Sequence, residues 1–142
     1  MGGIDDAVFK ASYVLAGGGA NLWVGNLARG LETNIFRIRT KGMARIPVLL
    51  DAVIPFGSPG TNDAPPADPS SFVRLGMGLF CVNRHEACVG GLFLDWSVRK
   101  VGLKELWTLK WHPNFKTAGR WTKAGGVNPE DWPAWMRNFK DY

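Results

Sequence analysis

Glycine and proline constrain this chain more than any other feature of its sequence. The 142 residues include 18 Gly and 9 Pro, so most apolar runs are short and end at a turn-forming residue. Residues 55–71 contain five prolines, which predicts a long loop there: Pro55, Pro59, Pro65, Pro66 and Pro69. Turns and extended chain are therefore expected to outweigh long helices. With 46% hydrophobic residues, a chain of this size can bury roughly 70% of its unfolded surface, and residues 1–142 are predicted to form a single domain.

Several apolar runs have the lengths and patterns of β-strands. Residues 46–54 (IPVLLDAVI) are almost continuously apolar, which indicates a central strand with Pro47 near its start. Residues 34–40 (NIFRIRT) alternate apolar and basic side chains and are predicted to form a half-buried strand. Residues 77–83 and 92–101 are predicted to be antiparallel neighbours, joined by the segment RHEACVGG with its two glycines in the turn. Residues 4–15 remain ambiguous between helix and strand.

Short helices are expected in the last third of the chain. Residues 103–111 place four apolar side chains on one helical face before Pro113 ends the run: Leu103, Leu106, Trp107 and Trp111. Asn128-Pro129-Glu130-Asp131 is a helix-start pattern and predicts a short helix through Trp135 and Phe139. The predicted fold class is α+β: an antiparallel sheet with a long Pro-rich loop and short C-terminal helices packed on it.

Positive charge and tryptophan are concentrated together at the end of the chain. The formal charge is +5, and residues 97–142 supply all of it, along with five of the seven Trp. In one interpretation Trp107, Trp111, Trp132 and Trp135 dock on the domain, while Lys104, Lys110 and Lys140 stay in water. In the alternative the same tail is a polyanion- or polysaccharide-binding module with stacking aromatic rings. Packing on short amphipathic segments favours the first interpretation.

His85 and Asp95 are the most informative polar pair. They lie ten residues apart with Gly90 midway, so a turn centred on Gly90 would place them opposite one another. We expect a polar clip that fixes hairpin register, held by a charge-assisted hydrogen bond; a ligand or metal site is the alternative. Adding Cys88 gives a hydrolase set on paper, but the chain has no nucleophile elbow or phosphate loop, and no enzyme activity is predicted.

No cofactor or metal is predicted, although the acidic residues of the Pro-rich segment offer possible oxygen ligands. Asn62, Asp63 and Asp68 could join Asp51 around calcium, although Asn and Asp beside Gly and Pro are usual turn residues. The two cysteines, at positions 81 and 88, do not make a disulfide framework, and their odd separation places them on opposite faces of a regular hairpin.

Residues 76–142 resemble the C-terminal region of bacterial pseudopilins, the pilin-like subunits of type II secretion and type IV pilus machines. The similar segments are RHEACVGGLFLDWSVRKVGLKELWTLKWHPNF and the ending WTKAGGVNPEDWPAWMRNFKDY. The family signature is His, nine residues, then Asp-Gly, and His85 and Asp95 match it. Trp96 stands where the family often has Gly, and Glu86-Ala87 where it often has Asn-Gly or Asp-Gly.

The resemblance implies a structural role. A pseudopilin head is carried outside the inner membrane on an N-terminal stalk helix, in the periplasm or at the cell surface. It acts by contact with other pseudopilin subunits or secretion-machine proteins, and no nucleic acid is expected as a partner. The sequence as given shows no targeting signal and no apolar run near the roughly 20 residues that span a membrane. The chain is therefore expected to be soluble and to correspond to a head without its stalk.

Overall fold

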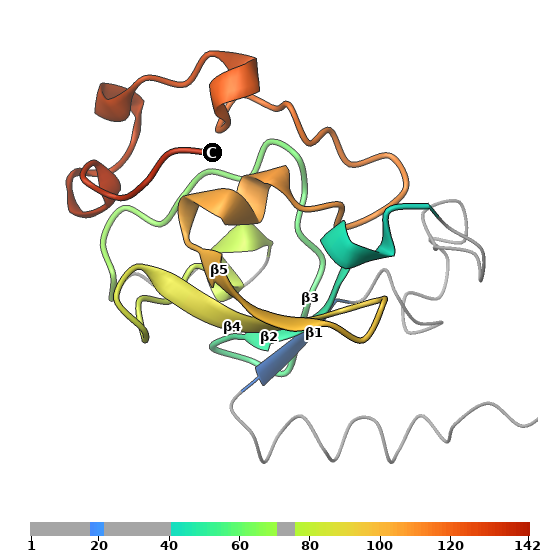
Figure 1. The fold of residues 1–142 in the computed structure, drawn as a ribbon. Helices are drawn as coiled ribbons and strands as arrows, with labels where there is room; N and C mark the ends of the chain where they lie inside the picture. Colours follow the sequence, from blue (N-terminus) through green and yellow to red (C-terminus); the bar gives the residue numbers. More distant parts are fainter. Residues whose placement is uncertain (1–17, 22–40, 71–75) are drawn as a thin grey trace, which may run out of the picture.

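A single five-stranded sheet organises the part of the chain that the structure describes. The structure is a computed structural model and describes residues 18–21, 41–70 and 76–142. The strands are β1 (Gly18–Asn21), β2 (Pro47–Asp51), β3 (Phe56–Gly57), β4 (Cys88–Phe93) and β5 (Val98–Gly102), in the spatial order β3-β1-β2-β4-β5 (Figure 1). Neighbouring strands are antiparallel except β1 and β3, which are parallel. The strand predicted at residues 34–40 and the segment 4–15, which the sequence left ambiguous between helix and strand, lie outside the described residues.

The apolar run at residues 46–54 supplies the central strand that was predicted, although the strand is shorter and ends at Asp51. Strand β2 lies between β1 and β4, and Leu50 on it is buried. Pro47 is the first residue of the strand, and the register against β4 shifts between Pro47 and Leu49. Proline lacks the N–H that a regular ladder needs, so its place at the strand's start limits the loss to one position.

The predicted hairpin of residues 77–83 and 92–101 is wrong in both strands, because residues 92 and 93 belong to β4 and residues 94–97 connect it to β5. Met77–Leu79 is a 3₁₀-helix, η3, and β5 pairs instead with β4, with Val89 opposite Val101. Gly90 and Gly91 therefore lie inside β4 and not in the turn. The turn forms where Asp95 can stabilise it, because its carboxylate accepts the Ser97 N–H at 3.0 Å and the Ser97 hydroxyl at 2.6 Å.

The helical content of the described residues consists of short 3₁₀ turns. These are η2 (Met43–Arg45), η3, η4 (Lys104–Thr108), η5 (Lys123–Gly125), η6 (Pro129–Asp131) and η7 (Ala134–Met136). The predicted helix start at Asn128 is present, because the Asp131 carboxylate accepts the Asn128 N–H at 2.8 Å and Pro129 is the first residue of η6. The predicted helix does not continue to Phe139, since Pro133 separates η6 from η7. Within the described chain, no helix is long and apolar enough to cross a membrane.

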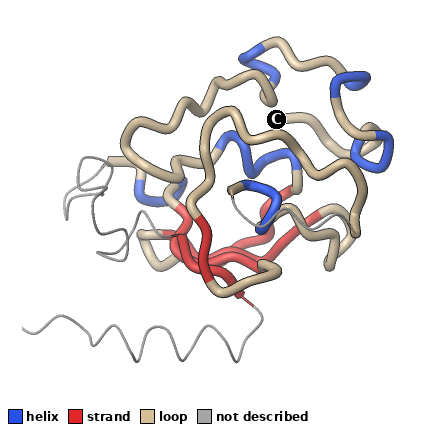
Figure 2. The backbone as a smooth tube through the Cα atoms, turned by 180° about the vertical axis from the view of Figure 1, so that it is seen from behind, coloured by secondary structure: helices blue, strands red, loops and turns tan. Residues whose placement is uncertain are grey.

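The chain after β5 covers one face of the sheet and closes the core (Figures 1 and 2). The largest fully buried side chains include Trp107, Trp111, Trp132, Phe80 and Phe93. The rings of Phe80 and Trp111 lie 4.7 Å apart, and those of Trp107 and Trp132 meet edge to face at 5.3 Å. Aromatic pairs in these geometries add to the stabilisation that burial provides.

The Pro-rich segment is held against this core by Asp63. Strand β3 interrupts the loop predicted at residues 55–71, and residues 58–70 then run without helix or strand, while residue 71 lies outside the described residues. The Asp63 carboxylate accepts the N–H groups of Gly60 and Met77, each at 2.8 Å, and the Asp63 carbonyl accepts the Trp107 indole N–H at 2.8 Å. Asp63 thus links the loop, η3 and η4 through its carboxylate and its backbone carbonyl.

Candidate functional site

The predicted clip between His85 and Asp95 does not form. Asp95 lies in the β4–β5 turn, whereas His85 precedes β4 at the other end of the hairpin, where Cys88 pairs with Gly102. The prediction failed because the turn is centred on residues 95 and 96 and not on Gly90. The three residues considered as a hydrolase site, Cys88, His85 and Asp95, are therefore not brought together.

His85 approaches a different carboxylate. Its Nε2 lies 3.4 Å from Asp51 Oδ2, and the same oxygen accepts the Gly90 N–H at 2.7 Å. Asp51 ends β2 and Gly90 lies on β4, so this carboxylate joins two neighbouring strands. The His85 side chain is 55% exposed, which makes this contact a surface interaction of small energetic value.

The acidic residues considered for calcium are separated and used in turns. Asp63 accepts backbone N–H groups, and Asp68 accepts the backbone N–H and the hydroxyl of Ser70. Across residues 18–21, 41–70 and 76–142, no three His, Cys, Asp or Glu side chains gather where they could hold a metal ion.

The two cysteines are free thiols. Cys81 is buried, and this burial raises the pKa of its thiol to about 12. Its Sγ lies 3.9 Å from the Met136 sulfur, inside the core. A thiol with so high a pKa stays protonated at neutral pH and is a poor nucleophile.

The basic tail packs onto the domain, with one departure from the prediction. Trp107, Trp111 and Trp132 are buried and Trp135 is half-buried. Lys140 is exposed and Lys110 half-buried, but the predicted exposure of Lys104 is wrong. The Lys104 side chain is fully buried, with its Nζ 2.7 Å from Asp141 and 5.0 Å from the Trp132 ring centroid. This ion pair with the chain's last turn was not visible as a local pattern in the sequence.

An open groove lies between the Pro-rich segment and the tail. Its volume is about 420 Å³, and its lining residues come from both segments: Ala64, Pro65, Ala67, Trp121, Glu130, Asp131, Trp132, Pro133 and Arg137. We call it the tryptophan groove. Two buried indole rings and two prolines are among its apolar lining residues. Its charged lining residues are the acidic Glu130 and Asp131 and the basic Arg137.

The indole N–H groups of the tail separate into two kinds. Those of Trp107, Trp111 and Trp135 donate to backbone carbonyls, the last of them to Pro66 at 3.0 Å. Those of Trp121 and Trp132 have no acceptor within the described chain, although both atoms are buried. Unpaired buried donors are uncommon in folded proteins, and these two belong to the residues that line the tryptophan groove.

The β4–β5 turn presents a second unusual surface, which we call the hairpin tip (residues 95–98). Trp96 is 80% exposed and Val98 is 76% exposed, the largest values among the large apolar side chains of the described residues. Trp96 also has φ of 67°, in the left-handed region that bulky residues rarely adopt. Hydrogen bonds from the Ser97 hydroxyl and N–H hold the pKa of the exposed Asp95 carboxyl below its usual value, so the tip carries a negative charge beside the indole.

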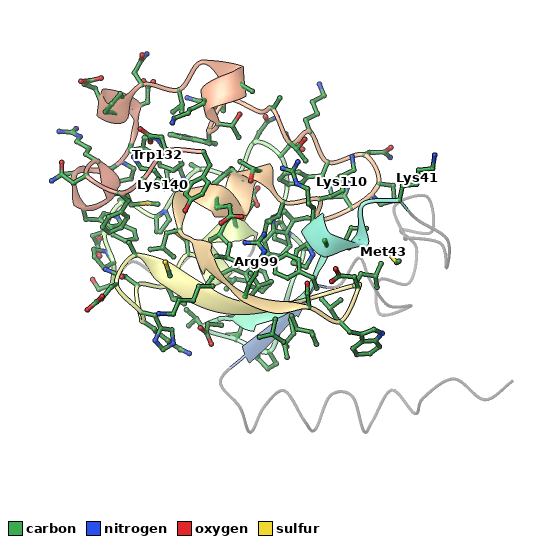
Figure 3. The ribbon with its side chains drawn as sticks, in the orientation of Figure 1. Lys41, Met43, Arg99, Lys110, Trp132 and Lys140 are labelled. Carbon is green, nitrogen blue, oxygen red and sulfur yellow. The ribbon has the colours of Figure 1, made fainter. Side chains whose placement is uncertain are left out.

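The two surfaces lie on opposite sides of the molecule as drawn in Figure 1. The β4–β5 turn lies at the right-hand edge of the molecule, near η2 and its Met43, whereas η6 and Trp132 lie at the upper left (Figures 1 and 3). The exposed apolar side chain of Met43 extends the apolar surface on the side of the turn.

Comparison of the chain with protein-family models, with curated proteins and with solved structures finds no match.

Proposed function

We propose that this chain is the head of a pilin-like subunit, which acts by protein–protein contact in a pseudopilus or pilus-like filament outside the inner membrane. The proposal keeps the α+β class expected for such a head, with the sheet as its base and the C-terminal segments packed on it. Its partners are other pilin-like subunits or proteins of the secretion machine.

The conformation of Trp96 carries the proposal. The signature that the chain resembles ends in Asp-Gly, and here Asp95-Trp96 occupies those positions. Asp95 accepts the Ser97 N–H, and Trp96 adopts the left-handed conformation that glycine enters without steric cost. The local geometry thus accounts for both residue types of the signature, which supports the resemblance independently of the letters themselves.

The burial of the tail supports contact through protein surfaces over binding of a polyanion. A stacking platform needs exposed rings beside basic side chains, but Trp107, Trp111 and Trp132 are at most 2% exposed. Lys104 is also withdrawn from the surface by its ion pair with Asp141. Trp96, the most exposed tryptophan of the described residues, lies in the β4–β5 turn and not beside these buried rings.

Photo-crosslinking in the native cells tests this function. A photoreactive residue is placed at Val98 on the hairpin tip, with the same residue at Lys123, on η5 in the tail, as the matched exposed control. We expect envelope-fraction adducts from position 98 whose partners, identified by mass spectrometry, are pilin-like subunits or secretion-machine proteins. Residence in the cytoplasm, or adducts to nucleic acid with steeply salt-dependent affinity, would overturn the proposal.

A further inference from the structure

Trp96 combines two features that local folding does not require. A glycine would form the same turn without the steric cost of φ at 67°, and a polar residue would avoid exposing 80% of an indole to water. Val98, two residues on and the first residue of β5, is 76% exposed. Trp is the residue type most enriched among side chains that dominate protein–protein binding, so the tip has the properties of an anchor.

The tryptophan groove has the properties of a receptor for such an anchor. Its accessible apolar surface comes from Pro133 and from the exposed Ala64 and Ala67, which lie over the buried rings of Trp121 and Trp132.

The charges of the two surfaces are complementary as well. The tip carries the Asp95 carboxylate, and the exposed Lys100 follows on β5. The groove carries Arg137 together with Glu130 and Asp131. An inserted tip can therefore pair Asp95 with Arg137 while Lys100 faces the two acids, an arrangement that favours one orientation.

We propose that the hairpin tip of one copy inserts Trp96 into the tryptophan groove of a second copy. The inference rests on the proposed function and deepens it by naming the partner as the same chain. Because tip and groove lie on opposite sides of the molecule (Figure 1), the contact is heterologous and extends head to tail without closing into a symmetric dimer. A single tip buries less area than a standard stable interface, so the contact is weak in solution and gains strength when subunits are held in a filament.

The test uses two variants that each remove one half of the contact. Trp96→Gly deletes the anchor and keeps the turn, and Ala67→Arg fills the groove from an exposed position. Val53→Ser, at a 45% exposed apolar side chain on neither surface, is the matched control. Sedimentation velocity of the full chain, up to roughly 1 mM where even weak contacts populate, measures the weight-average mass.

We expect the mass of the wild-type chain and of Val53→Ser to rise with concentration beyond that of a dimer. Each of the other variants alone should associate at least tenfold more weakly. A mixture of Trp96→Gly and Ala67→Arg should form a heterodimer and stop there, because one intact tip and one intact groove remain.

Three results overturn the inference: a monomeric wild type at every concentration, full association by Ala67→Arg alone, or no heterodimer in the mixture. As a second check, Glu130→Lys should weaken association and the double variant Lys100→Glu/Glu130→Lys should restore it, while no restoration counts against the charge pairing. Crosslinks from position 98 to other pilin-like subunits, together with a monomeric wild type, would leave the proposed function standing while this inference fails.

Discussion

The buried pair Lys104–Asp141 gives a prediction in which the two partners are unequal. The Lys104 side chain is 0% exposed and that of Asp141 is 28% exposed, with 2.7 Å between Nζ and Oδ1. Asp141→Ala leaves an ammonium group inside the protein with the Arg137 carbonyl at 3.2 Å and the Trp132 ring as its remaining contacts. Removing one member of a buried pair costs about 3–5 kcal/mol, and the partial exposure of Asp141 indicates the lower end, about 3 kcal/mol.

Lys104→Met should cost less. Methionine keeps most of the buried stem, and the half-open Asp141 carboxylate regains water, so we expect a loss of about 1 kcal/mol. The double variant should resemble Lys104→Met, which gives a coupling energy of about 3 kcal/mol. Lys140→Met is the control, since that side chain is exposed and should change stability by less than about 0.5 kcal/mol.

Urea denaturation at pH 7, followed by tryptophan fluorescence, measures these free energies of unfolding. All four variants keep every tryptophan, and each is fitted with its own baselines because Lys104 lies 5.0 Å from the Trp132 ring. If Asp141→Ala destabilised the protein no more than Lys104→Met, the ammonium group would have to reach water without its carboxylate, and the reasoning from burial would be refuted.

Three further predictions follow from backbone conformation and burial. Gly76 has φ of 80° and an added Cβ would collide with the Asp63 carboxylate, so Gly76→Ala should lower the free energy of unfolding by about 2–3 kcal/mol. Gly126 has φ of 84° but open space around it, so Gly126→Ala should lower the free energy of unfolding by only about 1 kcal/mol. Equal losses would contradict the steric argument. Trp96→Gly should keep or raise stability by up to about 1 kcal/mol and remove much of the iodide-quenchable fluorescence, whereas a clear loss of stability would show that the indole packs on the fold. Burial lowers the pKa of His112, so the unfolded chain binds more protons and the free energy of unfolding should fall as the pH drops below about 6.5. In His112→Gln this free energy should fall less steeply below pH 6.5 and should keep the wild-type pH dependence between pH 7.5 and 9. An unaltered fall below pH 6.5 would contradict the assignment to His112.

Local sequence signals determined several elements of this protein. The apolar run that contains β2 is long enough for a buried strand wherever its partners come from, and Pro47 could stand only near its start. Asn128 to Asp131 encodes its own helix start, because a capping carboxylate and a proline act within four residues. The packing of Trp107, Trp111 and Trp132 also followed from composition, since a domain of this size gains most by burying its largest rings.

Tertiary contacts decided the conformation of segments whose local sequence allows more than one structure. Met77–Leu79 has the apolar sequence expected of a strand, but it forms a 3₁₀ turn in which the Asp63 carboxylate of the Pro-rich segment accepts the Met77 N–H. The hairpin could turn at two glycines or at Asp95-Trp96, and pairing of Val89 with Val101 chose the second. That choice separates His85 from Asp95 and places Trp96 at an exposed tip.

The burial of Lys104 was decided in the same way. Its counterion lies 37 residues later along the chain, and a lysine's local pattern predicts solvent. The tryptophan groove likewise forms from residues 64–67 and 121–137, which no local pattern connects. Contacts between segments so far apart depend on how the whole chain closes over the sheet, and sequence periodicity reports only on neighbours within a turn or a strand.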